Sequence, residues 1–306
     1  MIPSGAMSSV TLPCQRHAVF PVLVAITSDT AAAAAIQVTQ ALAEECGAIP
    51  TVLHVAQDDL GVGGGSAGTI SGIPESELSA TYQDAQLAEL EAQVHAILGV
   101  LPRWRYEVDV GATVPTIVHR VQQVDAALVI LGLPHHNLLR RAFVRDTVQG
   151  VVEQTSAAVL AIHPALTRRP SCMLVAVDFS AASLRAAHLA CQLVAPGGRV
   201  VLVYVHPNAP SGGEETLASE ASPESGVEAA FTSLIDDLAT KKTITLTSVI
   251  EHGSSIEGVK AAALRIQPDL VALGSRHHSA VDWFFGDSVS TTMIDERRWS
   301  LLIVPE

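Results

Sequence analysis

Short apolar runs alternate with longer Ala-rich or polar stretches along the whole chain. The runs at residues 22–27, 51–55 and 128–132 are continuous rather than alternating, and they are rich in Val, Leu and Ile. Continuous runs of this kind predict strands that are buried on both faces of a parallel sheet. The Ala-rich stretches at 31–46 and 181–194 are long enough for helices. The pattern therefore predicts an α/β fold, in which strands and helices alternate.

The same order of elements occurs twice. The apolar run at 22–27 corresponds to one at 173–178, and the closing run at 158–162 corresponds to one at 301–304. So many elements agree in one order that the chain is a tandem repeat. Each half is expected to form an open parallel sheet with helices on both faces, a Rossmann-like domain.

The repeat also sets the expected domain boundaries. We predict a disordered segment at 1–17, a first domain at 18–165, a linker at 166–171 and a second domain at 172–306. The last strand of each half is apolar and carries no Lys, and an exposed edge of that kind pairs readily. We therefore predict that the two terminal strands face each other and form an intramolecular pseudo-dimer.

Composition narrows the classes of partner. Apolar residues make up 48% of the chain, but no apolar run is long enough for a transmembrane helix. The formal net charge is −13, whereas nucleic acids and anionic membranes bind through clustered Lys and Arg. We expect neither as a partner. The four cysteines lack metal-site or disulfide spacing, which is typical of reduced thiols, and we expect a cytoplasmic protein.

Several motifs together point to a family. Leu-Val-Ala-Val-Asp stands at 174–178, Asp-Leu-Val-Ala-Leu-Gly at 269–274 and Leu-Ile-Val-Pro at 302–305. With their first-half counterparts, over residues 19–164 and 172–305, these motifs resemble the universal stress protein (UspA-type) family. The resemblance implies adenine-nucleotide α-hydrolase-like domains and a role in stress response.

The resemblance also implies where a nucleotide would bind. ATP-binding members are expected to carry Gly-x2-Gly-x9-Gly-Ser/Thr after the fourth strand, and an Asp after the first strand that contacts the adenine end. Glycines allow backbone N–H groups to approach phosphates, and the following helix N-terminus adds positive potential. In the second domain the resemblance assigns this role to Asp178, Gly274, Gly286 and Ser288.

Both loops depart from the family pattern. In the second domain His277 replaces the second glycine, and Asp287 precedes the hydroxyl of Ser288. In the first domain Thr27 replaces the Asp, while His135 and Arg145 replace the second and third glycines. A side chain at these positions blocks close backbone approach. We therefore expect nucleotide binding to be lost in the first domain and weak or absent in the second.

These departures favour a non-enzymatic stress protein that acts through protein association and requires no cofactor. The alternative is an ATP or AMP sensor that binds in the second domain. A slow nucleotide hydrolase is a third reading, but it would need a bound triphosphate, Mg²⁺ and a positioned water. A homodimer is compatible with the sequence, although no residue specifies one.

Three further motifs have two readings each. The pairs His135-His136 and His277-His278 fit a metal site or pH sensor, or else solvated loop histidines. Arg140, Arg141 and Arg145 fit an anion site or a solvated helix face. Gly63-x-Gly65-x-x-Gly68 resembles a dinucleotide fingerprint, but it does not join a strand directly to a helix and is better read as a loop.

Overall fold

The computed structural model describes residues 10–11, 20–26, 31–56, 75–133, 140–207, 223–239, 243–275, 289–296 and 298–306. The chain forms two compact units that divide between Arg168 and Arg169, inside the segment predicted as a linker. The first unit is Ala18–Arg168, and the second unit is Arg169–Glu306 together with Met1–His17. Each unit is a Rossmann-like α/β domain, as the alternating pattern predicted.

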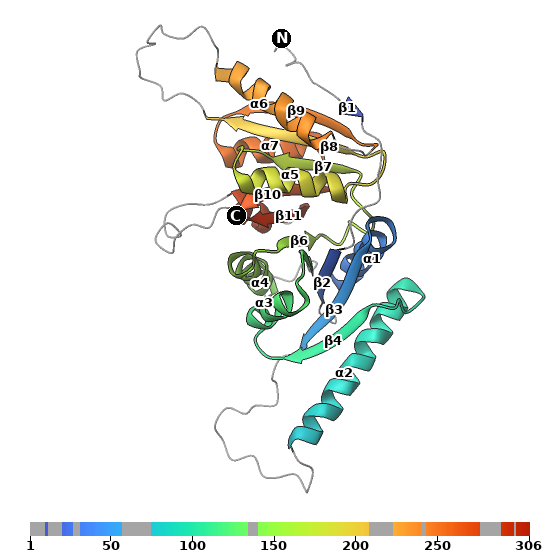
Figure 1. Cartoon of the computed structure of the whole chain (residues 1–306). Helices are drawn as coiled ribbons and strands as arrows, with labels where there is room; N and C mark the ends of the chain where they lie inside the picture. Colours follow the sequence, from blue (N-terminus) through green and yellow to red (C-terminus); the bar gives the residue numbers. More distant parts are fainter. Residues whose placement is uncertain are drawn as a thin grey trace. The chain divides into compact units, whose positions relative to one another are not determined.

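The first unit places five parallel strands in the order β6-β5-β2-β3-β4. Helices α1 and α2 pack against each other, as do α3 and α4, so that two helical layers enclose the sheet (Figure 1). Fully buried Val and Leu side chains from β2 and β5 form the centre of the core. The elements are β2 (Phe20–Ile26), α1 (Ala31–Cys46), β3 (Ala48–Ala56), α2 (Glu75–Leu98), β4 (Arg105–Val110), α3 (Thr113–Val124), β5 (Leu128–Gly132), α4 (Arg140–Gln154) and β6 (Ala158–Ile162).

The second unit repeats this order as β9-β8-β7-β10-β11, with β1 antiparallel at the β9 edge. Its elements are β1 (Val10–Thr11), β7 (Cys172–Ala176), α5 (Ala181–Leu193), β8 (Arg199–His206), α6 (Pro223–Leu238), β9 (Thr245–His252), α7 (Ser255–Ile266), β10 (Leu270–Ser275), α8 (Val289–Glu296) and β11 (Ser300–Pro305). Of the segment predicted to be disordered at 1–17, only the two residues of β1 are described. The pairing of β1 with β9 was not foreseen from the sequence.

The repeat extends to irregular backbone positions. Helices α3 and α7 both end at a non-glycine residue in the left-handed region, Asp125 with φ 50° and Gln267 with φ 51°. Gly111 and Gly253 follow β4 and β9 with φ of 151° and 126°, and each donates its N–H to the last residue of the neighbouring strand. Such agreement in unusual conformations is hard to explain except by duplication of one module.

The second unit holds the chain tightly just after the unit boundary. Arg169 is buried, and its guanidinium donates to three carbonyl oxygens at the end of α5: Leu193 O at 3.0 Å, Gln192 O at 3.1 Å and Val194 O at 2.5 Å. The last carbonyls of a helix have no partner within the helix, and a cation there also complements the helix dipole. Arg169 is therefore a structural cap rather than part of a loose linker.

A charged network joins β4 to α3 in the first unit. Arg120 lies 2.7 Å from Glu107 Oε2 and 2.6 Å from Asp109 Oδ2, and all three side chains are largely buried. Arg120 also donates to Asp109 Oδ1 at 2.7 Å, which makes the contact bidentate. Paired geometry of this kind fixes the crossover helix against the edge strand.

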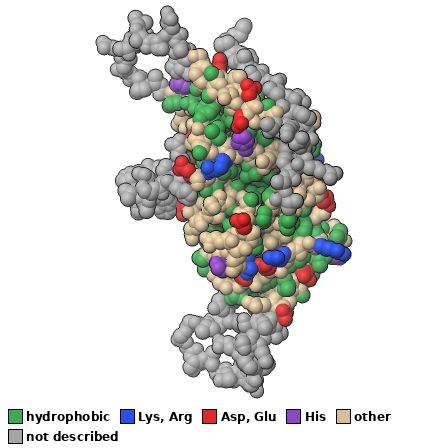
Figure 2. Space-filling view, viewed as in Figure 1, with side chains coloured by type: hydrophobic (Ala, Val, Ile, Leu, Met, Phe, Trp, Pro, Cys, Tyr) green, Lys and Arg blue, Asp and Glu red, His purple; other side chains and the backbone are tan. Residues whose placement is uncertain are grey.

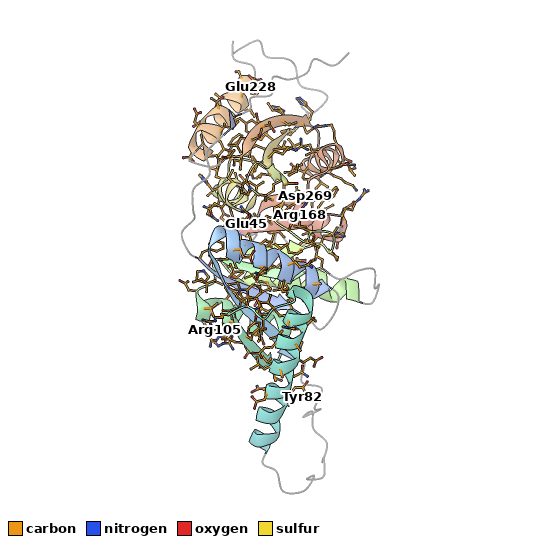
Figure 3. All side chains as sticks on the ribbon, turned by 90° about the vertical axis from the view of Figure 1, so that its right-hand side faces the viewer. Glu45, Tyr82, Arg105, Arg168, Glu228 and Asp269 are labelled. Carbon is orange, nitrogen blue, oxygen red and sulfur yellow. The ribbon has the colours of Figure 1, made fainter. Side chains whose placement is uncertain are left out.

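Helix α2 is much longer than the strands it covers. At 24 residues it spans about 36 Å, whereas the six residues of β4 span about 20 Å. Figures 1 and 3 show α2 running past β4, with Tyr82 on the projecting part. Between Tyr82 and Glu89 every side chain is at least partly exposed, and burial begins at Leu90 and Val94.

Among the helices that the structure describes, none is both long and apolar enough to cross a membrane. Cys46, Cys172 and Cys191 are buried and form no disulfide within the described residues. On the face drawn in Figure 2, acidic side chains are spread over the surface and Lys or Arg side chains are few.

We expect Arg169→Ala to destabilise the second unit by about 2–3 kcal/mol, because three carbonyls lose a charged donor in a buried setting. Urea unfolding followed by tryptophan fluorescence, in a Trp104→Phe/Trp283→Phe background, reports this unit through the buried Trp299. The matched control is Arg168→Ala, since Arg168 is exposed and should change stability by less than about 0.5 kcal/mol. Equal effects of the two substitutions would show that Arg169 is not a cap.

We expect Arg120→Ala to destabilise the first unit by about 1–2 kcal/mol, since Glu107 and Asp109 are left as neighbouring carboxylates without their cation. Scanning calorimetry measures the loss as a lower transition temperature. Arg105→Ala is the control, because Arg105 is 67% exposed and lies 4.0 Å from Glu107. A loss from Arg105→Ala as large as that from Arg120→Ala would contradict the assignment.

Candidate functional site

The sheet order singles out one edge of each unit. In doubly wound sheets, ligands bind beside the carboxyl ends of the strands at the point where strand order reverses. In the second unit the chain passes from β7 to β8 and β9, then returns to β10 on the other side of β7. Asp178 follows β7 and Gly274 lies near the end of β10. The fold therefore brings these two predicted residues to the same edge.

The carboxylate of Asp178 organises the turn into α5. Its Oδ1 accepts from Ser180 N at 3.0 Å and from Ser180 Oγ at 2.5 Å. Ser180 caps the helix, since its Oγ accepts from Ser183 N at 3.3 Å. Ser183 Oγ in turn donates to Ser180 O at 3.1 Å. One oxygen of the predicted adenine-contacting side chain is thus committed to helix capping.

Phe179 occupies an unusual conformation within the same turn. Its φ is 61°, in the left-handed region that bulky residues rarely adopt. The ring stacks on Tyr204 at a centroid distance of 5.7 Å and meets Phe231 edge-on at 5.4 Å. The left-handed backbone conformation of Phe179 has an unfavourable free energy by itself. The aromatic contacts and the turn made by Asp178 stabilise it.

Gly274 has a packing role that the sequence did not reveal. A Cβ added there would lie 2.5 Å from Ser183 N and 2.8 Å from the carbonyl carbon of Ala182. Both are backbone atoms in the first turn of α5, so they cannot move aside cheaply. The absence of a side chain at Gly274 lets α5 lie directly on β10, and this contact requires glycine whether or not a phosphate binds.

The remaining predicted positions fall outside the described residues or have undescribed side chains. In the second unit these are Gly286 and Ser288, with the replacements His277 and Asp287. In the first unit Gly132 ends β5, but Thr27 and His135 lie outside the described part, and only the backbone of Arg145, within α4, is described. His136, His278 and the glycine-rich segment 63–68 also lie outside the described residues. For Arg140 and Arg141 only the backbone is described.

Among the described residues, Cys172 and Tyr106 have shifted pKa values. Burial raises the pKa of the Cys172 thiol, against a smaller lowering effect of Arg199, whose Nε lies 3.1 Å from the sulfur. Burial, with a smaller contribution from Glu91, raises the pKa of Tyr106 to about 12. Cys172 opens β7 at the amino edge, and Tyr106 lies in β4 of the first unit. Neither group gives Asp178 an acid or base partner.

A row of aromatic rings extends along the carboxyl edge of the second unit. Beyond Phe179 and Tyr204, the His206 ring lies 6.3 Å from Tyr204, and the His252 ring lies 5.8 Å from His206. His206 and His252 end β8 and β9. The sequence analysis overlooked them because they are far apart in the chain. An alignment of the two halves could have shown them. It places His206 and His252 opposite Ala56 and Val110, so the two histidines stand out as a difference between the units.

We expect Gly274→Ala to destabilise the second unit by about 1–3 kcal/mol, because the new methyl group overlaps the backbone of α5. Urea unfolding measures the change without reference to any ligand. The control is Gly226→Ala within α6, where a Cβ meets nothing within 4 Å. That substitution should be neutral or stabilise by up to about 1 kcal/mol. A fully stable Gly274→Ala variant would restore the view that this glycine serves only a ligand.

Comparison with known proteins places this architecture in a family. The universal stress protein family matches the sequence twice, at residues 19–163 and 172–305. No curated protein matches the sequence significantly. A universal stress protein from Archaeoglobus fulgidus DSM 4304 has a similar structure, with a TM-score of 0.65 and 15% identity, covering 94% of this chain and 96% of that one.

Two proteins from Pseudomonas aeruginosa share the fold at lower similarity. One, from strain UCBPP-PA14 and described as a universal stress protein, has a TM-score of 0.53 and 12% identity, with 94% of each chain covered. The other, of unknown function and from strain PAO1, has a TM-score of 0.51 and 13% identity, covering 94% of this chain and 93% of that one. At these identities the structures support the fold, and the double family match establishes that the chain belongs to the universal stress protein family in a tandem two-domain form.

Proposed function

We propose that this universal stress protein acts through protein association rather than catalysis, and that its loops no longer hold a triphosphate. The observation that carries the proposal is the contact between Gly274 and the first turn of α5. This glycine is required for packing, so its presence in the sequence is not a sign of phosphate binding. In the second loop His277 occupies the second glycine position, and Asp287 stands between Gly286 and the hydroxyl of Ser288.

Charge supports the same conclusion. A triphosphate needs donors and cations around it, but Asp287 adds a negative charge beside the hydroxyl that would serve the phosphates. Asp178 Oδ1 already accepts from both Ser180 N and Ser180 Oγ, so an approaching adenine amino group has fewer acceptor positions on this carboxylate.

A second candidate is an adenine-nucleotide sensor in the second unit. It is favoured by the exposure of Asp178 at the edge where strand order reverses, which is where ligands of such sheets bind. Under this reading ATP or AMP binds beside Asp178, Gly274, Gly286 and Ser288. An enzyme is a weaker candidate, because Cys172, the described group of the second unit whose pKa is shifted, opens β7 at the opposite end of the strand from Asp178. The cysteine spacing is typical of reduced thiols, and on that ground we propose the cytoplasm.

Calorimetric titration with ATP and AMP tests the proposal. We expect no binding by the wild type at micromolar nucleotide. The variant His277→Gly/Asp287→Gly restores Gly-x2-Gly-x9-Gly-Ser from Gly274 to Ser288, and we expect it to gain affinity by tenfold or more, since two side chains no longer block the backbone amides. Asp178→Ala in the restored variant should lose the gain.

Micromolar affinity in the wild type would contradict the proposal and establish the sensor. A restored variant that folds normally but gains nothing would show that these two side chains are not the block. Phosphate release above background by the wild type, abolished by Asp178→Ala, would instead support the hydrolase. Sedimentation of the wild type tests separately whether two chains associate.

A further inference from the structure

The two histidines that end β8 and β9 form a pair with defined geometry. His206 and His252 are direct register partners in the parallel ladder. Their ring centroids lie 5.8 Å apart, and the ring planes meet at 39°. Register partners project from the same face of a sheet, so both imidazoles stand on one face at the carboxyl edge.

The hydrogen bond of His206 fixes which ring nitrogen carries the proton. Nδ1 lies 2.9 Å from Pro207 O, and a carbonyl oxygen can only accept. Nδ1 is therefore the donor, and in the neutral ring Nε2 keeps its lone pair. An imidazole whose other nitrogen donates to a backbone carbonyl is the common arrangement of metal-binding histidines.

Neighbouring groups hold the pair in place. Gly253 N donates to His206 O at 3.0 Å, which ties the two strand ends together beyond the ladder. The Tyr204 ring meets the His206 ring edge-on, and Tyr204 is in turn stacked on Phe179. His206 is partly buried and His252 is exposed, so the pair is ordered on one side and open to solvent on the other.

The ring separation suits a shared ion. A metal bonded to one nitrogen of each ring at ~2.1 Å lies ~3.2 Å from each ring centroid, so the centroids can be at most ~6.4 Å apart. The observed 5.8 Å is within this limit and corresponds to an open angle at the metal. The described residues contain no group of three or more His, Cys, Asp or Glu that could hold a metal ion. Two imidazoles therefore make a site that water must complete.

We propose that His206 and His252 bind a divalent first-row transition metal ion such as Cu²⁺ or Ni²⁺, with water in the remaining positions. Imidazole suits these ions, whereas Mg²⁺ and Ca²⁺ prefer oxygen ligands. The order of affinity for divalent ions predicts tighter binding of Cu²⁺ than of Ni²⁺. The proposed ligands differ from Asp178, Gly274, Gly286 and Ser288, the residues assigned to a nucleotide.

The tandem repeat supplies a matched scaffold for the test. Ala56 and Val110 are the register partners at the equivalent place in the first unit, and Gly111 N donates to Ala56 O at 3.1 Å. The backbone arrangement is therefore the same, and only the side chains differ. Ala56→His/Val110→His should create a second site in a chain that otherwise lacks one there.

Calorimetric titration of the full chain with Ni²⁺ and with Cu²⁺ measures the affinity. We expect His206→Gln and His252→Gln each to weaken binding by about tenfold or more, because one of two imidazole ligands is lost. A chain with His135, His136, His277 and His278 all changed to Ala should keep the wild-type affinity for this site. Ala56→His/Val110→His should raise the number of bound ions by one.

Cu²⁺ electron paramagnetic resonance gives a second readout, since hyperfine coupling to two imidazole nitrogens should fall to one in either Gln variant. Circular dichroism confirms that the variants fold. Binding that survives the double His206→Gln/His252→Gln variant, or that disappears with the four loop histidines, would overturn the proposal. Equal binding of Mg²⁺ would also overturn it, because that ion does not select imidazole.

Discussion

The second unit depends on a close approach between helix α5 and strand β10. Gly274 leaves room for the backbone of Ala182 and Ser183, and the cap built by Asp178 and Ser180 holds that first turn in position. The same turn carries Phe179, whose ring begins the aromatic row on the carboxyl edge. The packing of α5 on β10, the cap at the start of α5 and the carboxyl edge of the sheet therefore share the same few residues. A substitution at Gly274 is expected to affect all three.

The fold could be predicted from the sequence because its main signal is local. Continuous runs of Val, Leu and Ile gave the strands, and repetition of their order gave two Rossmann-like domains. The contacts that define the site are not local. Gly274 faces the backbone of Ala182 and Ser183, which lie far from it in the sequence, and His206 meets His252 only through strand register. No spacing rule within a short motif contains those contacts.

Comparison of the two halves shows how a duplicated module diverges. The backbone conformations agree even at Asp125 and Gln267, both in the left-handed region. The side chains at the carboxyl edge do not agree, since the first unit has Ala56 and Val110 where the second has two histidines. The backbone framework is therefore kept, whereas the side chains at these strand ends have changed. Function is therefore expected to differ between the units.

The projecting part of α2 has a consequence for local stability. The stretch from Tyr82 to Glu89 buries no side chain, so its helical form depends on intrinsic propensity and hydrogen bonds within the helix. A segment held in this way opens with a far smaller free energy than the global unfolding of its domain. Amide exchange and protease cleavage should therefore begin on the Tyr82 side of α2 and stop near Leu90, where the first buried side chain fastens the helix to the sheet.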